Sequence, residues 1–332
     1  MMKLSILDQV PVRKGSSPEQ SLNESIEMIQ LAESLGYKRY WFAEHHSTRG
    51  LASSAPEILI AAAAAATKKI RVGSGGVLLP QYSPYKVAET FRQLSALYPG
   101  RIDLGLGRSP GGTEKVRLAL TDGHKKSMTD FQRQLNDLIF FLTDTLPPDH
   151  PSYGIKAAPS ASILPELFLL GLGENSARLS GSKGAGYVFG HFIKNERGER
   201  AHGLYKEVFA SSPFHDSPSP ITAIFIICAD TEEKAEELAM SQDLWLLRVE
   251  KGLDSRIPDY EEAASYPYTE SDREKISHNR RRMVIGSPET VKKQLLELKD
   301  AYQAEEFMVL TNVYSFEDRK NSYKLLSKLF PQ

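Results

Sequence analysis

The sequence predicts an α/β fold, a (β/α)₈ barrel, and three observations lead to it. Short apolar or β-branched runs alternate with longer helical patterns along the whole chain, which is typical of βα units around a parallel sheet. Eight such pairings can be counted. The length of 332 residues suits one large core, because long single domains are often α/β barrels. We therefore expect residues 1–332 to form a single barrel domain with loop insertions.

The expected strands are short and bounded by turn residues. They are residues 4–7, 39–43, 70–79, 102–106, 167–170, 187–189, 221–228 and 307–311. The run ITAIFIIC at 221–228 is the least ambiguous, because eight apolar or β-branched residues in a row are typical of a buried strand.

The expected helices lie between these strands. They cover residues 21–35, 56–66, 84–97, 128–142, 201–209, 231–247 and 316–330, with two more starting near 175 and at 288. Gly36 ends the first helix, Pro84 opens the third, and Ser287 caps the helix that Pro288 begins. The loop from Pro147 through Ser162 carries Pro, Gly, Ser and Ala, as an insertion at a barrel rim would, and the stretch 251–279 is a polar insertion.

Alternation of strands and helices does not by itself distinguish a closed barrel from an open sheet. A doubly wound open sheet, with helices on both faces, therefore remains the alternative fold.

Composition and charge exclude several classes of protein. Lysine and arginine number 41 against 42 for aspartate and glutamate, and a net charge of −1 gives no general attraction to nucleic acid or anionic lipid. The only cysteine, Cys228, excludes an internal disulfide and suits a reducing cytoplasm. The N-terminal segment lacks the pattern of a signal peptide, and the apolar run at 55–66 is too short to span a membrane. We expect a cytoplasmic protein.

The functional residues of such a barrel lie at the carboxyl ends of its strands. Four of these ends are chemically unusual. Their sequences are AEHH at 43–46, GSGG at 73–76, GRSPGG at 107–112 and GLGENS at 171–176. Together they indicate a planar, anionic ligand.

Two of these loops could hold a phosphate. Arg108, on a glycine-rich loop, can offer forked donors to it. On the other loop, the donors would be the backbone amides of Gly173, Glu174, Asn175 and Ser176. These amides open an expected helix, whose positive end favours an anion. The Glu174 carboxylate would repel a phosphate, so its backbone is the better candidate; plain turns with an exposed arginine are the alternative.

The other two strand ends offer a bare backbone and two imidazoles. Gly75 and Gly76 add no side-chain packing, which indicates either a flat ligand close to the backbone or a bulge at the rim. Strand alternation would turn either His45 or His46 into the pocket, as a general base or as a hydrogen-bonded rim residue. We expect no metal at these histidines and Glu44, because no further ligands follow at a recognised spacing.

Seven segments, spread over nearly the whole chain, carry a resemblance to a known family. They are RYWFAEHH, ASSAPEIL, IRVGSGGVLLP, SPYKVAETF, PGRIDLGLGRSPGG, IGSPETV and EEFMVLTNVY. In this order they resemble the luciferase-like flavin-dependent monooxygenases and oxidoreductases. The resemblance implies a (β/α)₈ barrel that holds FMN at its carboxyl-terminal mouth, often as a homodimer. Reduced FMN and oxygen would there act on a small organic substrate in a pocket that excludes water.

The resemblance also implies roles for individual residues. His45 would be the base near the flavin, and Gly75-Gly76 matches a non-proline cis peptide that lies against the flavin ring. Arg108 would bind the phosphate together with the GLGENS loop, and His191 would line the pocket.

The resemblance does not extend to every property of the family. Light-emitting luciferases tend to carry a cysteine where this chain has Gly107, so the resemblance does not extend to light emission. A separate reductase would supply reduced flavin, because the chain has no nicotinamide-binding fingerprint. The alternatives are a deazaflavin-dependent dehydrogenase on the same barrel and a flavin-binding protein without turnover. Segments 113–128 and 251–279 should shape the substrate pocket but carry no motif that identifies the substrate.

Overall fold

The computed structural model describes residues 2–109 and 111–331, so Pro110 of the GRSPGG loop lies outside the described residues. In the described part of the chain, eight parallel strands form a closed ring. In order they are β1 (Lys3–Asp8), β2 (Arg39–Phe42), β3 (Arg71–Ser74), β5 (Ile102–Gly107), β6 (Glu166–Gly171), β7 (Gly186–Gly190), β8 (Pro220–Cys228) and β10 (Glu306–Leu310). Pairing of β10 with both β1 and β8 closes the ring. The (β/α)₈ prediction is confirmed, and the open sheet is excluded.

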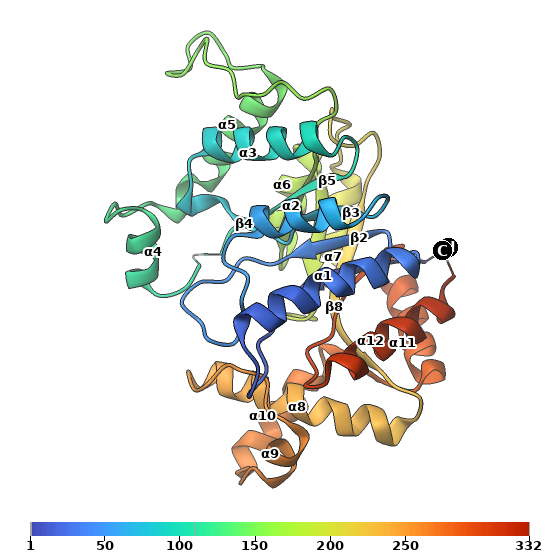
Figure 1. Cartoon of the computed structure of the whole chain (residues 1–332). Helices are drawn as coiled ribbons and strands as arrows, with labels where there is room; N and C mark the ends of the chain where they lie inside the picture. Colours follow the sequence, from blue (N-terminus) through green and yellow to red (C-terminus); the bar gives the residue numbers. More distant parts are fainter. Residues whose placement is uncertain (1, 110, 332) are drawn as a thin grey trace.

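Helices surround this ring on all sides (Figure 1). They are α1 (Pro18–Ser34), α2 (Pro56–Ala66), α3 (Pro84–Leu97), α5 (Phe131–Thr143), α6 (Glu174–Ser182), α7 (Gly198–Glu207), α8 (Glu232–Glu250), α11 (Pro288–Tyr302) and α12 (Phe316–Leu329). Ser17, Ser83 and Ser287 each accept a hydrogen bond from the third residue of the helix that follows, and each precedes a proline. These caps set the starts of α1, α3 and α11.

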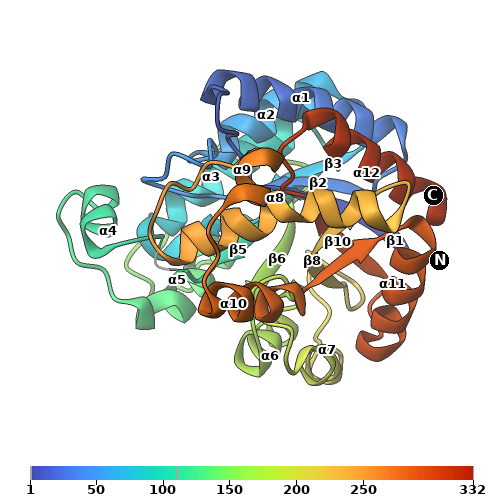
Figure 2. The same ribbon diagram turned by 90° about the horizontal axis from the view of Figure 1, so that it is seen from below.

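Several further elements lie outside this simple repeat. They are β4 (Val77–Leu78), the 3₁₀ turns η1 (Leu79–Gln81) and η2 (Met128–Asp130), α4 (Glu114–Leu120), α9 (Tyr260–Ser265), α10 (Glu270–Arg280) and β9 (Met283–Gly286). The stretch 251–279 thus contains α9 and most of α10, and Figure 2 shows these two helices on either side of α8. In the same view α4 stands away from the barrel at the left.

One expected strand was wrong in its extent, and one observed strand was not expected. The strand expected at 70–79 stops at Ser74, and the chain resumes as β4 after Gly75-Gly76. The second is β9, which was not predicted and which pairs with the end of β8, from Phe225–Met283 to Cys228–Gly286. The nine residues of β8 therefore serve both the barrel and this additional strand.

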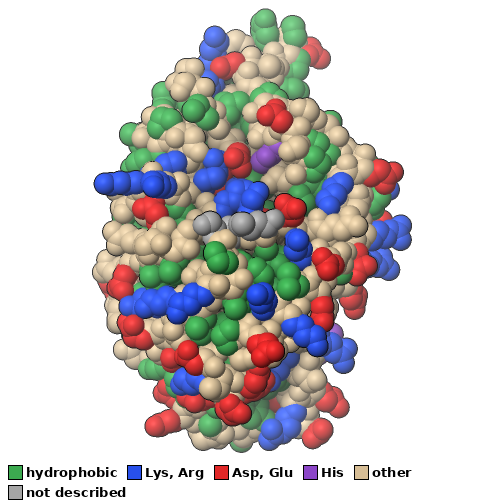
Figure 3. Space-filling view, turned by 90° about the vertical axis from the view of Figure 1, so that its right-hand side faces the viewer, with side chains coloured by type: hydrophobic (Ala, Val, Ile, Leu, Met, Phe, Trp, Pro, Cys, Tyr) green, Lys and Arg blue, Asp and Glu red, His purple; other side chains and the backbone are tan. Residues whose placement is uncertain are grey.

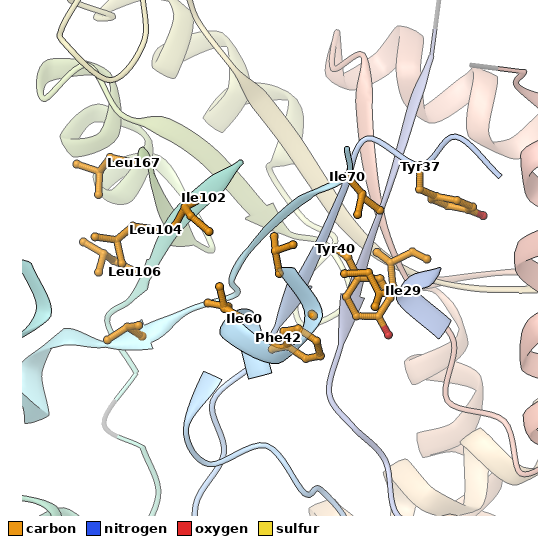
Figure 4. Close-up of a cluster of buried hydrophobic side chains, with 14 of the residues drawn as sticks. Ile29, Tyr37, Tyr40, Phe42, Ile60, Ile70, Ile102, Leu104, Leu106 and Leu167 are labelled. Carbon is orange, nitrogen blue, oxygen red and sulfur yellow. The ribbon is translucent and has the colours of Figure 1, made fainter. Parts of the chain in front are cut away.

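The main core lies between the barrel and its helices. Tyr40 and Phe42 of β2 point outward into it, where they meet side chains such as Ile29 of α1 and Ile60 of α2 (Figure 4). Trp41, between them, points inward and packs edge-on against Phe168, with ring centroids 5.0 Å apart. Both faces of β2 are therefore buried, as expected of a barrel strand.

A buried ionic cluster fills the barrel at the amino-terminal ends of the strands. Arg39 is fully buried and lies 2.7 Å from Asp103 and 2.6 Å from Glu306. Burial alone would lower the pKa of Arg39, but the two carboxylates raise it. Trp41 Nε1 donates to Asp103, 2.8 Å away, and so connects the cluster to the apolar layer above it. This end of the barrel is therefore filled.

The outer surface on the side where β1 begins and α12 ends carries charges of both signs. Figure 3 shows lysine and arginine side chains interspersed with aspartate and glutamate over this face, without a large area of one sign. Among the described helices, none has the length and apolar character needed to cross a membrane.

Candidate active site

A large cavity lies at the carboxyl ends of the barrel strands. Its volume is about 1280 Å³, and its wall consists of the loops after β2, β3, β5, β6 and β7 together with one side of α8. Ligand pockets usually measure about 300 to 1,000 Å³. The cavity therefore has room for a planar cofactor and a small second molecule.

Most residues expected at the site lie together in the wall of this cavity. They are His45, Gly75, Gly76, Arg108, Gly173, Glu174, Asn175 and Ser176. His191 is not among the residues that line it. Val188 and Gly190 of β7 line the cavity, so alternation turns His191 to the opposite side, where its Nδ1 lies 2.8 Å from the Tyr302 hydroxyl.

The peptide between Gly75 and Gly76 is cis, as the resemblance implied. Its position is held by the Gly75 amide, which donates to the Phe42 carbonyl at 2.8 Å. A Cβ atom on Gly76 would lie 2.8 Å from the carbonyl oxygen of Gly105, closer than real Cβ atoms approach a backbone atom. Only glycine fits there, and the cavity wall at this point is bare backbone.

His45 presents an uncharged imidazole to the cavity. Its Nδ1 is buried and has no hydrogen-bond partner among the described residues. Burial, and then the neighbouring His46, lowers the pKa of His45 to about 4, so the ring is neutral near pH 7. The expectation that only one of the two histidines faces the cavity was wrong, because β2 ends at Phe42 and strand alternation does not extend to them. The residue therefore contributes an uncharged imidazole to the cavity wall.

Glu44 organises a second group that sequence reasoning missed. Its carboxylate accepts the Leu78 amide at 2.9 Å and the Tyr82 hydroxyl, and it lies 2.7 Å from His46 Nε2. Burial, with this bond to the carboxylate, raises the pKa of the Tyr82 hydroxyl. The group fixes the loop after β2 against η1 and so positions His46. Over residues 2–109 and 111–331, no three His, Cys, Asp or Glu side chains are grouped to hold a metal ion.

The loops after β5 and β6 form an anion-binding end. The helix α6 starts at Glu174, so the first amides of this helix lack intrahelical acceptors and its positive end faces the cavity. The Glu174 carboxylate is compensated by Arg200, 3.0 Å away, and Ser176 Oγ donates to the Gly173 carbonyl at 2.7 Å. Arg108 is exposed and forms no ion pair with any described residue. A phosphate group fits these donors.

Another part of the wall is apolar and aromatic. The rings of Phe192 and Phe225 meet edge-on with centroids 5.4 Å apart, and Phe225 meets Trp245 of α8 in the same way at 6.3 Å. Trp245 Nε1 donates to the Ser255 carbonyl at 2.8 Å, so its only polar atom is already paired. This wall can exclude water and hold an apolar group.

Comparison with known proteins places this barrel and its cavity in one family. The luciferase-like monooxygenase family matches residues 2–304, and the chain belongs to that family. It is 66% identical over 330 residues to the uncharacterized protein YceB of Bacillus subtilis, covering 99% of this chain and 100% of the relative.

Two further matches extend over nearly the whole chain. The chain is 34% identical to the N-acetyl-S-alkylcysteine monooxygenase of Bacillus subtilis, over 98% of each protein. Among solved structures it is similar to apo-MsnO8, with 40% identity, a TM-score of 0.91 and coverage of 99% of this chain and 98% of the other.

Proposed function

We propose that the protein is an FMN-dependent monooxygenase that uses reduced FMN and oxygen to oxidise a small organic substrate. The observation that carries this proposal is the convergence of three features in one cavity. A bare glycine backbone at Gly75-Gly76, a neutral imidazole at His45 and an anion-binding end at Arg108 and α6 together fit a planar cofactor with a phosphate. Membership of the luciferase-like monooxygenase family supports the reaction class.

Each part of the cavity would have a separate task. Reduced FMN, when bound, supplies the electrons that activate oxygen. The Gly75-Gly76 backbone would support the flat ring, and Arg108 with the first amides of α6 would hold the phosphate. His45 would accept a proton or a hydrogen bond through its imidazole, because the ring is neutral. The aromatic wall would exclude water from the reacting atoms.

Two partners complete the proposal. A separate flavin reductase would supply the reduced FMN, and the protein would form a homodimer. A relative that is 34% identical is named as a monooxygenase of N-acetyl-S-alkylcysteines, so thioethers belong in the first substrate trials.

The test is an anaerobic titration of the protein with oxidised and with reduced FMN, beside an Arg108→Ala variant. We expect FMN to bind, and the variant to bind it at least about tenfold more weakly, because a charged phosphate contact contributes about 1.5 to 3 kcal/mol. Riboflavin, which lacks the phosphate, should bind equally to both proteins.

The other outcomes separate the alternatives. Failure to bind either form of FMN would overturn the proposal, and binding of a reduced deazaflavin instead would favour the dehydrogenase. If reduced FMN binds but consumes oxygen at the same rate and with the same products as free reduced FMN, for every substrate tried, the protein is a flavin carrier rather than an oxygenase.

A further inference from the structure

The cavity wall carries more positive charge than the anion-binding end accounts for. Its cationic side chains are Arg108, Lys194, Arg197 and Arg282, and its carboxylates are Glu44, Glu174 and Glu250. Arg108 lies on the loop after β5, whereas Lys194 and Arg197 lie on the loop between β7 and α7. The second pair of cations therefore comes from a different part of the barrel mouth.

The carboxylates of the wall do not neutralise this second pair. Each of them already has a polar partner other than Lys194 and Arg197. The pairs are Glu44 with Tyr82, Glu174 with Arg200, and Glu250 with both Lys275 and Arg282, the latter a cation of the same wall. Within the described ranges, no carboxylate comes within ion-pairing distance of Lys194 or Arg197. In a chain whose net charge is only −1, this local excess of cations favours an anionic ligand.

The loop that carries Lys194 and Arg197 is held in place by its neighbours. Its backbone makes three hydrogen bonds to them: Phe192 N to the Ala223 carbonyl at 3.1 Å, Arg282 Nη1 to the Ile193 carbonyl at 2.7 Å, and the Tyr302 hydroxyl to the Asn195 carbonyl at 3.1 Å. Its backbone is therefore fixed from β8, from the start of β9 and from α11. The two cations project from a positioned loop, which reduces the entropy lost when an anion binds.

The same loop also contributes to the apolar wall. Phe192 packs on Phe225 inside the cavity, while Ile193 and Val249 at its rim are 49% and 44% exposed. Exposed apolar side chains around a cavity are a surface that a ligand can cover. Cationic and apolar side chains thus line the cavity together, from this short segment and from helix α8.

Building on the proposed function, we propose that the substrate is a small amphiphilic organic acid. Its carboxylate would bind Lys194 and Arg197, and its apolar part would lie against Phe192, Phe225 and Trp245. The arginine can donate two parallel hydrogen bonds to a carboxylate, and the lysine adds a point charge. A neutral analogue of the same shape lacks these contacts. The cavity would then hold two anionic groups at separate places, the cofactor phosphate at Arg108 and the substrate carboxylate at the β7–α7 loop.

The test compares acids with their neutral counterparts. The probes are butanoate, hexanoate, octanoate and 3-phenylpropanoate, each beside its primary amide. Binding at low salt is followed by tryptophan fluorescence, because Trp245 lines the cavity, with and without FMN. We expect at least one acid to bind tenfold or more tightly than its amide, a difference of about 1.4 kcal/mol.

Two double variants assign this preference to the loop. Lys194→Ala/Arg197→Ala should abolish the preference for the acid without changing the affinity for FMN. Lys292→Ala/Lys293→Ala, which removes two exposed lysines of α11 away from the cavity, should retain it.

Three results would overturn the inference. The first is that acid and amide bind equally, or not at all, in every pair. The second is that the Lys194→Ala/Arg197→Ala protein still prefers the acid. The third is that this protein loses affinity for FMN, which would assign the two cations to the cofactor. Failure of the proposed function looks different, because the wild-type protein would then bind no FMN while the preference for acids persisted.

Discussion

Arg319 of α12 and Asp8 at the end of β1 form a buried ion pair in which Nη2 lies 2.7 Å from Oδ1. Asp8 also accepts hydrogen bonds from Ser25 Oγ at 2.6 Å and from the Tyr40 hydroxyl. Burial alone would raise the pKa of Asp8, but the charge of Arg319 and these hydrogen bonds lower it. The pair joins the first strand of the barrel to its last helix.

Replacing Arg319 should therefore destabilise the whole fold. In Arg319→Met the buried carboxylate of Asp8 loses its cation, and we expect the free energy of unfolding to fall by about 3 to 5 kcal/mol. Lys324→Met, an exposed change on the same helix, should alter it by less than about 0.5 kcal/mol. Urea unfolding at neutral pH measures both, and equal stabilities of the two variants would contradict the prediction.

Adding a methyl group at Gly76 should disturb the cavity wall at this position. The new Cβ would meet backbone atoms of Gly105 at 2.8 and 2.9 Å, which cannot move aside as a side chain could. We expect Gly76→Ala to cost about 1 to 3 kcal/mol of stability and to weaken FMN binding.

Gly203→Ala is the matched control for this change. Gly203 lies within α7, and a Cβ there has no atom within 4 Å, so the substitution should stabilise the protein by about 0.5 to 1 kcal/mol. If the unfolding curves of the two variants coincide, the backbone around Gly76 has room for a methyl group.

Removing the imidazole of His45 should affect turnover rather than cofactor binding. We expect the turnover rate of His45→Ala to be lower by a factor of about 10² to 10⁴, because a positioned proton acceptor accelerates a reaction by this factor. Affinity for FMN, measured by fluorescence titration, should hardly change. His278→Ala, at an exposed position of α10, is the control and should retain full turnover. Normal turnover in His45→Ala would remove His45 from the reaction.

Acid should weaken the fold through buried histidines. Burial lowers the pKa of His45 and of His191 to about 4 and that of His202 to about 3, below the ordinary value of about 6.5. Between those values the unfolded chain binds more protons than the folded one. The contribution of each neutral histidine to stability is therefore present above about pH 6.5 and is lost as the pH falls towards 4.

His202→Gln tests this relation at one site. The slope of unfolding free energy against pH, between about 4.5 and 6, should fall by about 1.4 kcal/mol per pH unit, because one proton fewer is taken up on unfolding. Burial raises the pKa of Asp243 to about 6, which acts in the opposite direction, but it is common to both proteins and cancels in the difference. A slope that is unchanged in His202→Gln would contradict the prediction.

The sequence predicts the barrel because most of its strands can be recognised from their own residues. Residues 221–228 form a continuous apolar run, and capped helices follow most strands, so each unit is recognisable within its own segment. The strand β9 is only four residues long and finds its partner in β8, far away in the sequence. Its pairing depends on tertiary structure, which local patterns do not contain.

The site was predictable only where strand ends carry unusual residues. Gly75, Gly76 and Arg108 attract notice in the sequence for that reason. The contact between Glu44 and Tyr82 joins residues 38 positions apart and has no local signal. His191 shows a different limit. Val188 lines the cavity, so strand alternation places His191 on the other side of the chain, but the sequence does not tell which residues of β7 face inward.

The pairing of β1 with β10 also has a consequence for synthesis on the ribosome. Asp8 precedes Arg319 by 311 residues, which at about 5 to 20 residues per second is a wait of at least about 15 seconds. During that time β1 lacks its β10 neighbour and Asp8 has no cation, and a free strand edge is a template for pairing with other chains. Newly made chains should therefore be most prone to aggregate, and most dependent on chaperones, until the last helix has emerged.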